Sequence, residues 1–301
     1  MILVKPSFKI LASSVCSGIF QYTYHKWGWK KLIEVAGRTC YKSEEKITED
    51  SSEKFFEFIK KIGHHSVLEH SWFVKEISFF LFIKTLFKNP HFLYLKWIKW
   101  NKWIVAGNWR ALFEFNPILL DKKDYPITLE EIYKYPKLGA MTVKLIVDRG
   151  VTHEQVRHRP DISYSQESSR YVNYKGGCTF VIPPWCRNIP CGEFNDDQIA
   201  ADETLSTTAS ESIWFTSMLD AEKKYIQLVR EGWTPQQARS VLPNSTKTEI
   251  VITANFREWK HIFNLRCAKT AHPQMQEIMR PLLKECQTLM PELFKNVYYE
   301  E

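Results

Sequence analysis

Residues 139–171 read GAMTVKLIVDRGVTHEQVRHRPDISYSQESSRY, and this stretch decides how the chain is organised. Its first part is apolar and rich in β-branched residues, which predicts a strand closed by Gly150. Thr152 and Gln155 fit a capping box, so a short helix should follow, and Pro160 should stop that helix. The order therefore predicts a strand, a helix whose last turn carries the Arg-His-Arg triplet, and then a polar loop.

The polar part of this stretch, residues 157–171, indicates an anion site. It holds three arginines and a histidine among hydroxyl, amide and carboxylate side chains. Guanidinium groups can clamp a phosphate bidentately, while amides and hydroxyls can bind the edge of a base. The alternative is a solvated, charged surface on a helix and its exit loop.

Helical periodicity and apolar runs predict further elements on both sides of this stretch. They are a strand near the N-terminus, a helix over 51–63, a core strand over 77–83, a helix from Trp214 to Gly232, a helix after Thr234, a strand over 248–255, a helix after Asn255 and a final helix over 275–289. Strands separated by helices of unequal length predict an α+β fold, with a mixed β-sheet flanked by helices. No linker or repeat divides the chain, so we expect a single domain over residues 1–301.

The composition is that of a folded, basic protein. Of 301 residues 44% are hydrophobic, and the net charge of +7 is spread along the chain. This pattern favours nucleotides as partners at least as well as nucleic acid. The seven cysteines include no CxxC pair, which favours a reducing, cytoplasmic setting. No apolar run approaches the roughly 20 residues of a membrane span, so no membrane association is expected.

Arg266 falls within an apolar stripe of the helix predicted after Asn255. The 3.6-residue period places it beside Trp259, Ile262 and Phe263. A guanidinium cannot shed its charge, and burying it unpaired would cost several kcal/mol, so it needs a partner. A ligand would satisfy that need, and so would a snorkelling side chain or an internal ion pair. A polar wall beside the stripe is offered by Asn255, Arg257 and His261.

Residues 63–70, GHHSVLEH, are rich enough in histidine to suggest a metal site. Their spacing is HxxxEH, which is neither HExxH nor HxxEH, so we expect no metal there. The chain also lacks GxGxxG, GxxxxGK[ST] and GxSxG, which argues against a Rossmann site, a P-loop and an α/β-hydrolase.

Four motifs, in order, resemble one known family. They are GHHSVLEH (63–70), DRGVTHEQVRHRPDISYSQESSRY (148–171), ARSVLPNSTKT (238–248) and NFREWKHIFNLRCAKTAHPQMQEI (255–278). Together they resemble the flavin-dependent thymidylate synthases, the ThyX family, and GNWRALFEF (107–115) is similar to that family's GN-x-R segment. The resemblance implies an α+β fold and FAD as cofactor. It also implies reductive methylation of dUMP to dTMP, with methylenetetrahydrofolate as carbon donor and NADPH as reductant.

The resemblance implies roles for individual residues. The residues expected to bind dUMP are Glu154, Arg157, Gln166, Glu167, Ser168, Ser169, Arg170 and Arg239. Those expected to bind FAD are His64, Ser66, Arg157, His158, Arg159, Gln166, Asn255, Arg257 and His261. Arg266 would lie against the uracil and favour its N3-ionised form, and Ser168 is the other catalytic candidate. Members of the family are usually homotetramers with active sites shared between subunits, so we expect that assembly here.

The match departs from the family pattern at one place. The family signature has seven residues between Arg-His-Arg and a serine, whereas eight residues separate Arg159 from Ser168. Strict counting would put Glu167 at the signature position. An extra residue between Pro160 and Ile162 restores the register, because a loop can absorb it.

We expect no side chain to form an obligatory covalent bond to dUMP. Cys267 follows Arg266, but on a helix it points about 100° away. Ser168 would need an adjacent base, and only His158 is near in sequence, with no third group evident to orient it. Arg266 would instead polarise the pyrimidine.

Two other classes of function remain open. A nucleic-acid-binding protein would use the positive charge and the many aromatic residues. A metal-dependent hydrolase would use the HHSVLEH segment. The spectrum of the purified protein separates these classes, because only the flavoenzyme absorbs visible light.

Overall fold

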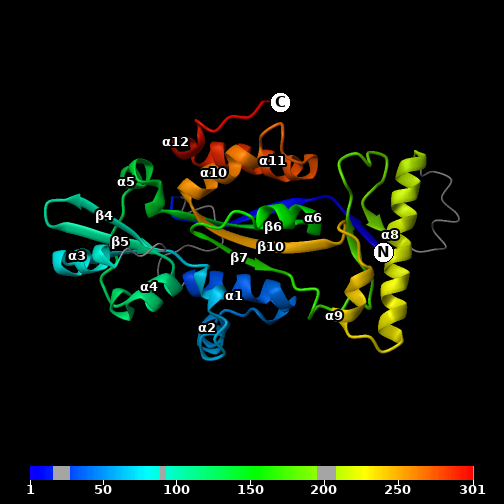
Figure 1. The fold of residues 1–301 in the computed structure, drawn as a ribbon, viewed down its shortest axis with the longest axis horizontal. Helices are drawn as coiled ribbons and strands as arrows, with labels where there is room; N and C mark the ends of the chain where they lie inside the picture. The colour runs from blue at the N-terminus through cyan, green and yellow to red at the C-terminus, as the bar shows by residue number, and fades with distance from the viewer. Residues whose placement is uncertain (16–27, 89–92, 195–207, 301) are drawn as a thin grey trace.

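The computed structural model describes residues 1–15, 28–88, 93–194 and 208–300 (Figure 1). Helices and strands alternate irregularly along the chain, which confirms the α+β class. The described strands form three sheets rather than one, with the orders β2-β6-β10-β7, β3-β5-β4 and β8-β1-β9. The sequence predicted the strands but not how they divide among sheets, because pairing partners depend on tertiary packing.

The four-stranded sheet forms the centre of the molecule (Figure 1). Its strands are β2 (Ser7–Ser13), β6 (Ala140–Asp148), β7 (Ile162–Gln166) and β10 (Lys247–Asn255). Every neighbouring pair in this sheet is antiparallel. The predicted strands before Gly150 and over 248–255 are therefore confirmed, and they are each other's neighbours.

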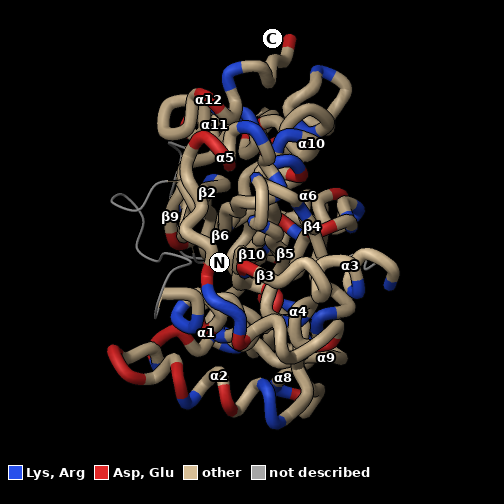
Figure 2. The backbone as a smooth tube through the Cα atoms, turned by 90° about the vertical axis from the view of Figure 1, so that its left-hand side faces the viewer, with Lys and Arg blue, Asp and Glu red and all other residues tan. Residues whose placement is uncertain are grey.

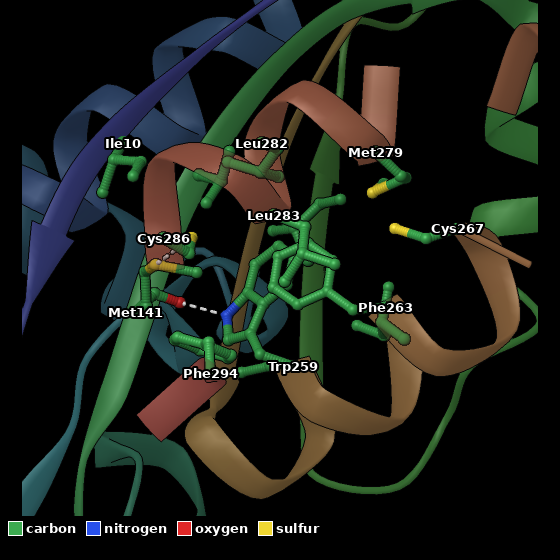
Figure 3. Close-up of a cluster of buried hydrophobic side chains, with 14 of the residues drawn as sticks. Ile10, Met141, Trp259, Phe263, Cys267, Met279, Leu282, Leu283, Cys286 and Phe294 are labelled. Carbon is green, nitrogen blue, oxygen red and sulfur yellow. Dashed lines mark hydrogen bonds between the residues drawn. The ribbon is translucent and has the colours of Figure 1, made fainter. Parts of the chain in front are cut away.

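The C-terminal helices cover one face of this sheet. They are α10 (Phe256–Arg266), α11 (Pro273–Leu289) and α12 (Pro291–Phe294). Figure 3 shows Trp259 lying between Phe263, Phe294 and the sheet, and its indole nitrogen donates to the carbonyl of Met141 at 2.9 Å. The buried tryptophan thus gains both apolar contact and a partner for its polar atom.

The N-terminal helices cover the opposite face. They are α1 (Gly28–Tyr41), α2 (Ser51–Lys61) and the short 3-10 helix η2 (His65–Glu69). Leu32 and Ala36 of α1 pack with Val251 of β10 in a second buried cluster. Both faces of the central sheet are covered, which explains why β6 and β10 are buried almost throughout.

The other two sheets lie at the two ends of the molecule (Figure 1). One end has β3 (Phe73–Ile77), β4 (Tyr94–Lys99), β5 (Lys102–Gly107), α3 (Phe79–Phe87) and α4 (Trp109–Phe115). The other has β1 (Ile2–Val4), β8 (Thr179–Val181), β9 (Gly192–Glu193), α8 (Ala209–Arg230) and α9 (Pro235–Ala238). The remaining helices are η1 (Glu44–Lys46), η3 (Pro117–Leu119), α5 (Leu129–Lys134), η4 (Pro136–Leu138), α6 (Arg149–Gln155) and η5 (Arg239–Val241).

The predicted helix from Trp214 to Gly232 is confirmed as α8. Gly232 lies just beyond its end with a φ of 90°, a conformation that glycine adopts without strain. The capping box of Thr234 and Gln237 is confirmed at the start of α9. None of the helices in the described part of the chain is both long and apolar enough to cross a membrane.

The core strand predicted over residues 77–83 is wrong. Strand β3 ends at Ile77, and Ser78 caps α3 by accepting a hydrogen bond from the Leu81 amide. Phe80 is 79% exposed on this helix. A short apolar run fits a strand or a helix equally well, and here the cap decides in favour of the helix.

The helix after β6 differs from its prediction at both ends. Asp148 is the cap of α6, because its carboxylate accepts from the Val151 amide at 2.7 Å, so Gly150 and Thr152 lie within the helix. The helix ends at Gln155, and the Arg-His-Arg triplet therefore follows it instead of forming its last turn. A carboxylate at the end of a strand captures the first free amides, which starts the helix one turn earlier.

Candidate active site

Arg266 joins several predicted site residues at the end of α10. Its Nε donates to Nε2 of His158 at 2.8 Å, and its Nη1 bonds Oε2 of Glu154 at 3.0 Å. Its Nη2 donates to the carbonyl of Glu154 at 2.8 Å. The guanidinium thus has the partners that its place on an apolar stripe requires, and part of the requirement is met by an internal ion pair.

His158 is neutral in this arrangement. Burial, with Arg266 and His261 nearby, lowers the pKa of His158 to about 4. Its ring lies edge-on to that of His261, with centroids 5.6 Å apart. Because Nε2 accepts from Arg266, the neutral ring carries its proton on Nδ1. Glu154, His158, His261 and Arg266, which the sequence assigned to two different ligands, therefore form one polar cluster.

A cleft of about 580 Å³ lies beside this cluster. Its lining includes two predicted FAD residues, Arg159 and Arg257. Both are exposed, and neither forms an ion pair with any residue that the structure describes. Two unpaired guanidinium groups at one cleft form a site for an anion such as a diphosphate.

The cleft also has cations that the sequence analysis did not assign to the site. Arg110 and Lys137 line it, paired with Glu69 at 2.7 Å and with Asp161 at 3.1 Å. The GN-x-R segment contains Arg110 and could have identified it. For Lys137 the sequence offered no signal, because residues far apart in the chain bring it to the cleft.

The predicted dUMP residues after β7 form a second group. Nη1 of Arg239 donates to Oγ of Ser169 at 3.3 Å, and the amide of Ser168 donates to the carbonyl of Cys40 at 3.0 Å. Arg170 is exposed and lies over the ring of Tyr171. None of these residues lines the 580 Å³ cleft. Arg157 is exposed after α6.

Three predicted ligand residues have partners inside the protein. Glu167 is buried, pairs with Lys247 at 2.9 Å and accepts from the Tyr174 hydroxyl at 2.8 Å. Asn255 caps α10 by accepting from the Glu258 amide. Gln166 donates to the hydroxyls of Thr152 and Thr248. In this structure these side chains hold the walls of the site together.

The histidines of residues 63–70 have separate partners. His64 is exposed with its Nδ1 3.5 Å from the Tyr41 hydroxyl, and Ser66 is exposed beside it in η2. His65 lies 3.8 Å from Glu114, and His70 is buried. No group of three or more His, Cys, Asp or Glu side chains within the described ranges is placed to hold a metal. This divergence disfavours the metal-dependent hydrolase.

The charge pattern disfavours the nucleic-acid-binding protein. Lys and Arg alternate with Asp and Glu along the whole backbone in Figure 2, without a continuous basic stripe. Proteins that bind nucleic acid through charge concentrate their basic residues on one face.

The comparison with protein families decides the assignment. The family model described as thymidylate synthase complementing protein matches residues 22–83 and 137–292. The chain belongs to the flavin-dependent thymidylate synthase family. It is accordingly a methyltransferase. The matched ranges include every residue of the Arg266 cluster, whereas Arg110 lies outside them.

Curated members of this family match most of the chain. The flavin-dependent thymidylate synthase of Mycobacterium marinum is 26% identical over 271 residues, which is 89% of this chain and 80% of that protein. The enzyme of Mycobacterium tuberculosis strain H37Rv is 25% identical over 275 residues, with the same coverage. Among solved structures, the UMP/dUMP methylase PolB of Streptomyces cacaoi bound with 5-Br UMP is 16% identical, with a TM-score of 0.46. That alignment covers 98% of this chain and 95% of PolB, and a score at this level carries no argument.

Cys267 is placed as the sequence predicted for a residue without a covalent role. It is fully buried, and burial raises the pKa of its thiol to about 12. A nucleophilic cysteine needs an exposed, electropositive setting that lowers the thiol pKa. In this member of the family, Cys267 therefore packs in the core beneath α11.

Proposed function

We propose that this enzyme converts dUMP to dTMP by reductive methylation, with FAD as cofactor, methylenetetrahydrofolate as carbon donor and NADPH as reductant. The observation that carries the proposal is the cluster of Arg266, Glu154 and His158 beside a cleft with two unpaired arginines. Membership of the family supports the same reaction.

The residues at the cleft fit an FAD site. Arg159 and Arg257 offer unpaired guanidinium groups for the diphosphate, and His158 and His261 offer ring edges nearby. The fixed cations replace the glycine-rich phosphate loop that the sequence lacks. When bound, FAD would supply the redox chemistry that the protein side chains cannot.

The nucleotide would be held by the second group. Arg239 and Ser169 are already joined by a hydrogen bond, and Arg157 and Arg170 are exposed and unpaired within the described residues. Guanidinium groups would bind the phosphate of dUMP, and the hydroxyls of Ser168 and Ser169 would bind near it.

Arg266 would act on the pyrimidine. Its cation, placed against the uracil, would stabilise the N3 anion and so raise the electron density of the ring. Glu154 and His158 would hold the guanidinium in that orientation, since each already bonds it. No covalent attachment to the ring would then be required, in keeping with the buried Cys267 thiol.

A homotetramer with shared sites would explain the separation of the two groups. Within one chain the cleft and the Ser169–Arg239 pair do not share a pocket. A neighbouring subunit could bring the anion site of one chain to the cleft of another. Size-exclusion chromatography with light scattering measures this directly, and a monomer that still forms dTMP would contradict it.

The proposed reaction is tested with purified protein. The chromophore released on denaturation is identified by mass spectrometry, and dTMP formation from dUMP, methylenetetrahydrofolate and NADPH is followed by chromatography. We expect FAD and dTMP. Folded protein that binds no FAD in equilibrium dialysis, or that consumes NADPH without ever forming dTMP, would contradict the proposal.

A further inference from the structure

Strand β7 is bonded on one face to the segment that carries the Arg-His-Arg triplet. The Tyr164 hydroxyl lies 2.8 Å from the carbonyl of Gln155 and 3.0 Å from that of His158. Gln166, two residues on, donates to the Thr152 hydroxyl of α6 at 3.0 Å. Side chains alternate along a strand, so these two residues share a face.

The other face of β7 is bonded to the end of η2. Oγ of Ser163 donates to the carbonyl of Glu69 at 3.3 Å, and Oγ of Ser165 lies 2.9 Å from Nε2 of His70. Each hydroxyl is buried. The polar sequence of this strand thus joins two segments that are distant in the chain, one on each face.

His70 is the centre of the second set of bonds. It is fully buried, and its Nδ1 lies 2.8 Å from Oγ1 of Thr253 on the neighbouring strand β10. Thr253 in turn lies 2.7 Å from Oγ1 of Thr142 on β6. The bonds form a continuous chain from Ser165 through His70 and Thr253 to Thr142, across three strands and η2.

The imidazole of His70 stays neutral over the working range of pH. Burial lowers its pKa to about 3, and no carboxylate contacts it among the described residues. A neutral ring has one donor and one acceptor nitrogen, so both hydroxyl partners are used in a fixed direction. The chain of bonds is therefore rigid and insensitive to pH.

The two segments joined by His70 carry residues of the two proposed ligand sites. His70 directly follows η2, which is preceded by His64 and contains Ser66, both expected at FAD. Ser165 directly precedes Gln166 and the dUMP group that includes Ser168. His70 itself contacts neither group.

We propose that His70 is a positioning residue, which fixes the FAD-binding segment of η2 at a set distance from the dUMP-binding segment after β7. This inference rests on the proposed function. The carbon and electron transfers require flavin, folate and pyrimidine to meet, whereas oxidation of NADPH requires the flavin site alone. A displacement of about 1 Å between two bound reactants can slow a reaction by about a hundredfold.

The test compares the full reaction with the flavin half-reaction in three variants of the FAD-loaded enzyme. His70→Leu removes both ring nitrogens, and His70→Gln keeps one donor and one acceptor. Thr85→Val is the matched control, because Thr85 is a buried residue whose hydroxyl bonds only within α3, at the end of the molecule.

We expect His70→Leu to lower kcat for dTMP formation by about a hundredfold while the NADPH oxidation rate and the Kd for FAD and for dUMP change less than about threefold. His70→Gln should recover most of the lost rate, and Thr85→Val should match the wild type. In ligand-free protein, hydrogen exchange of residues 165–170 should accelerate in His70→Leu and return towards wild type in His70→Gln.

Each result has a defined meaning. Normal dTMP formation by His70→Leu, or equal loss of both reactions, would overturn the inference, since a merely structural role lowers both alike. If His70→Leu does not fold, Ser165→Ala and Thr253→Val make the same comparison with one hydroxyl removed at a time. Wild-type protein that forms no dTMP would contradict the proposed function itself, and the inference with it.

Discussion

Two apolar regions of this chain have similar sequences and opposite environments. In α10 and α11, Trp259, Phe263 and Met279 are fully buried against the central sheet (Figure 3). In α3 and the β4–β5 turn, Phe87 and Trp100 are each 85% exposed. Apolar periodicity indicates that a surface can be covered, but the covering surface is supplied by the rest of the fold. The α10 region lies on a sheet, whereas α3 lies at an end of the molecule (Figure 1).

The same two regions differ in their relation to the family. The α10 region and the Arg266 cluster lie in the matched ranges, whereas residues 84–136 lie outside them. Residues 78–108 contain five lysines and no Asp or Glu. We therefore expect the α10 region to determine stability and chemistry, and the α3 region to contribute little to either.

The largest effect on stability is expected for Trp259→Ala. The side chain is fully buried, and its removal leaves a cavity in the main core and an unpaired carbonyl at Met141. Such a substitution costs about 3–5 kcal/mol of unfolding free energy. Urea denaturation measures the change, and a loss below about 1 kcal/mol would show that the α10 region is not the main core.

A smaller effect is expected from the charge cluster on the other face of the sheet. Burial raises the pKa of Glu249, but hydrogen bonds from Lys144, Lys247 and Lys42 outweigh it and lower the pKa to about 2. Because the folded-state pKa is depressed, the stabilisation is present above about pH 4.5 and is lost as pH falls towards 2. We expect a loss of about 2 kcal/mol across that window, after allowance for partial exposure.

The control for this pH effect is Glu249→Gln. The variant should be less stable at pH 7, because three lysines lose their partner, and its stability should fall less steeply between pH 4.5 and 2. Thermal melts at several pH values measure both. An unchanged acid slope in the variant would assign the effect to other carboxylates.

Cys267 sharpens the comparison within the α10 region itself. Cys267→Ser places a hydroxyl in a fully buried position and should cost about 1–2 kcal/mol of stability. The folded variant should form dTMP within about threefold of wild type, since the thiol does not take part. Intact-protein mass spectrometry after incubation with 5-fluoro-dUMP and the folate should show no nucleotide adduct. A denaturation-stable adduct in the wild type would contradict this.

The smallest effects are expected at the exposed end. Phe87→Ser and Trp100→Ser should each change the unfolding free energy by no more than about 0.5 kcal/mol, because little apolar contact is lost. The same urea titrations apply. A loss above about 2 kcal/mol would mean that this surface is covered in solution.

The sequence predicted those parts of the fold that depend on local pattern. Strand β10, the Asn255 cap and helix α10 follow from residues that are neighbours in the chain. It could not predict that 77–83 would leave the sheet at Ser78, because a seven-residue apolar run has no period long enough to decide. Nor could it predict that Asp148 would cap α6 ahead of Thr152, since both residues suit a cap.

The candidate site was predicted to the same limit. The need of Arg266 for a partner followed from its place on an apolar stripe, and the structure supplies Glu154 and His158. The inward turn of Glu167 towards Lys247 was not predictable, because Lys247 is 80 residues away and meets it only through the pairing of β7 with β10.

Formation of dTMP by Arg266→Ala tests the central claim most directly. The account predicts that this variant binds FAD, keeps the flavin spectrum and oxidises NADPH, yet forms dTMP at least about a hundredfold more slowly than wild type, since one preorganised cation is lost from the site. Arg230→Ala, an exposed arginine at the end of α8, is the control and should behave as wild type. Turnover by Arg266→Ala within about threefold of wild type would contradict the account.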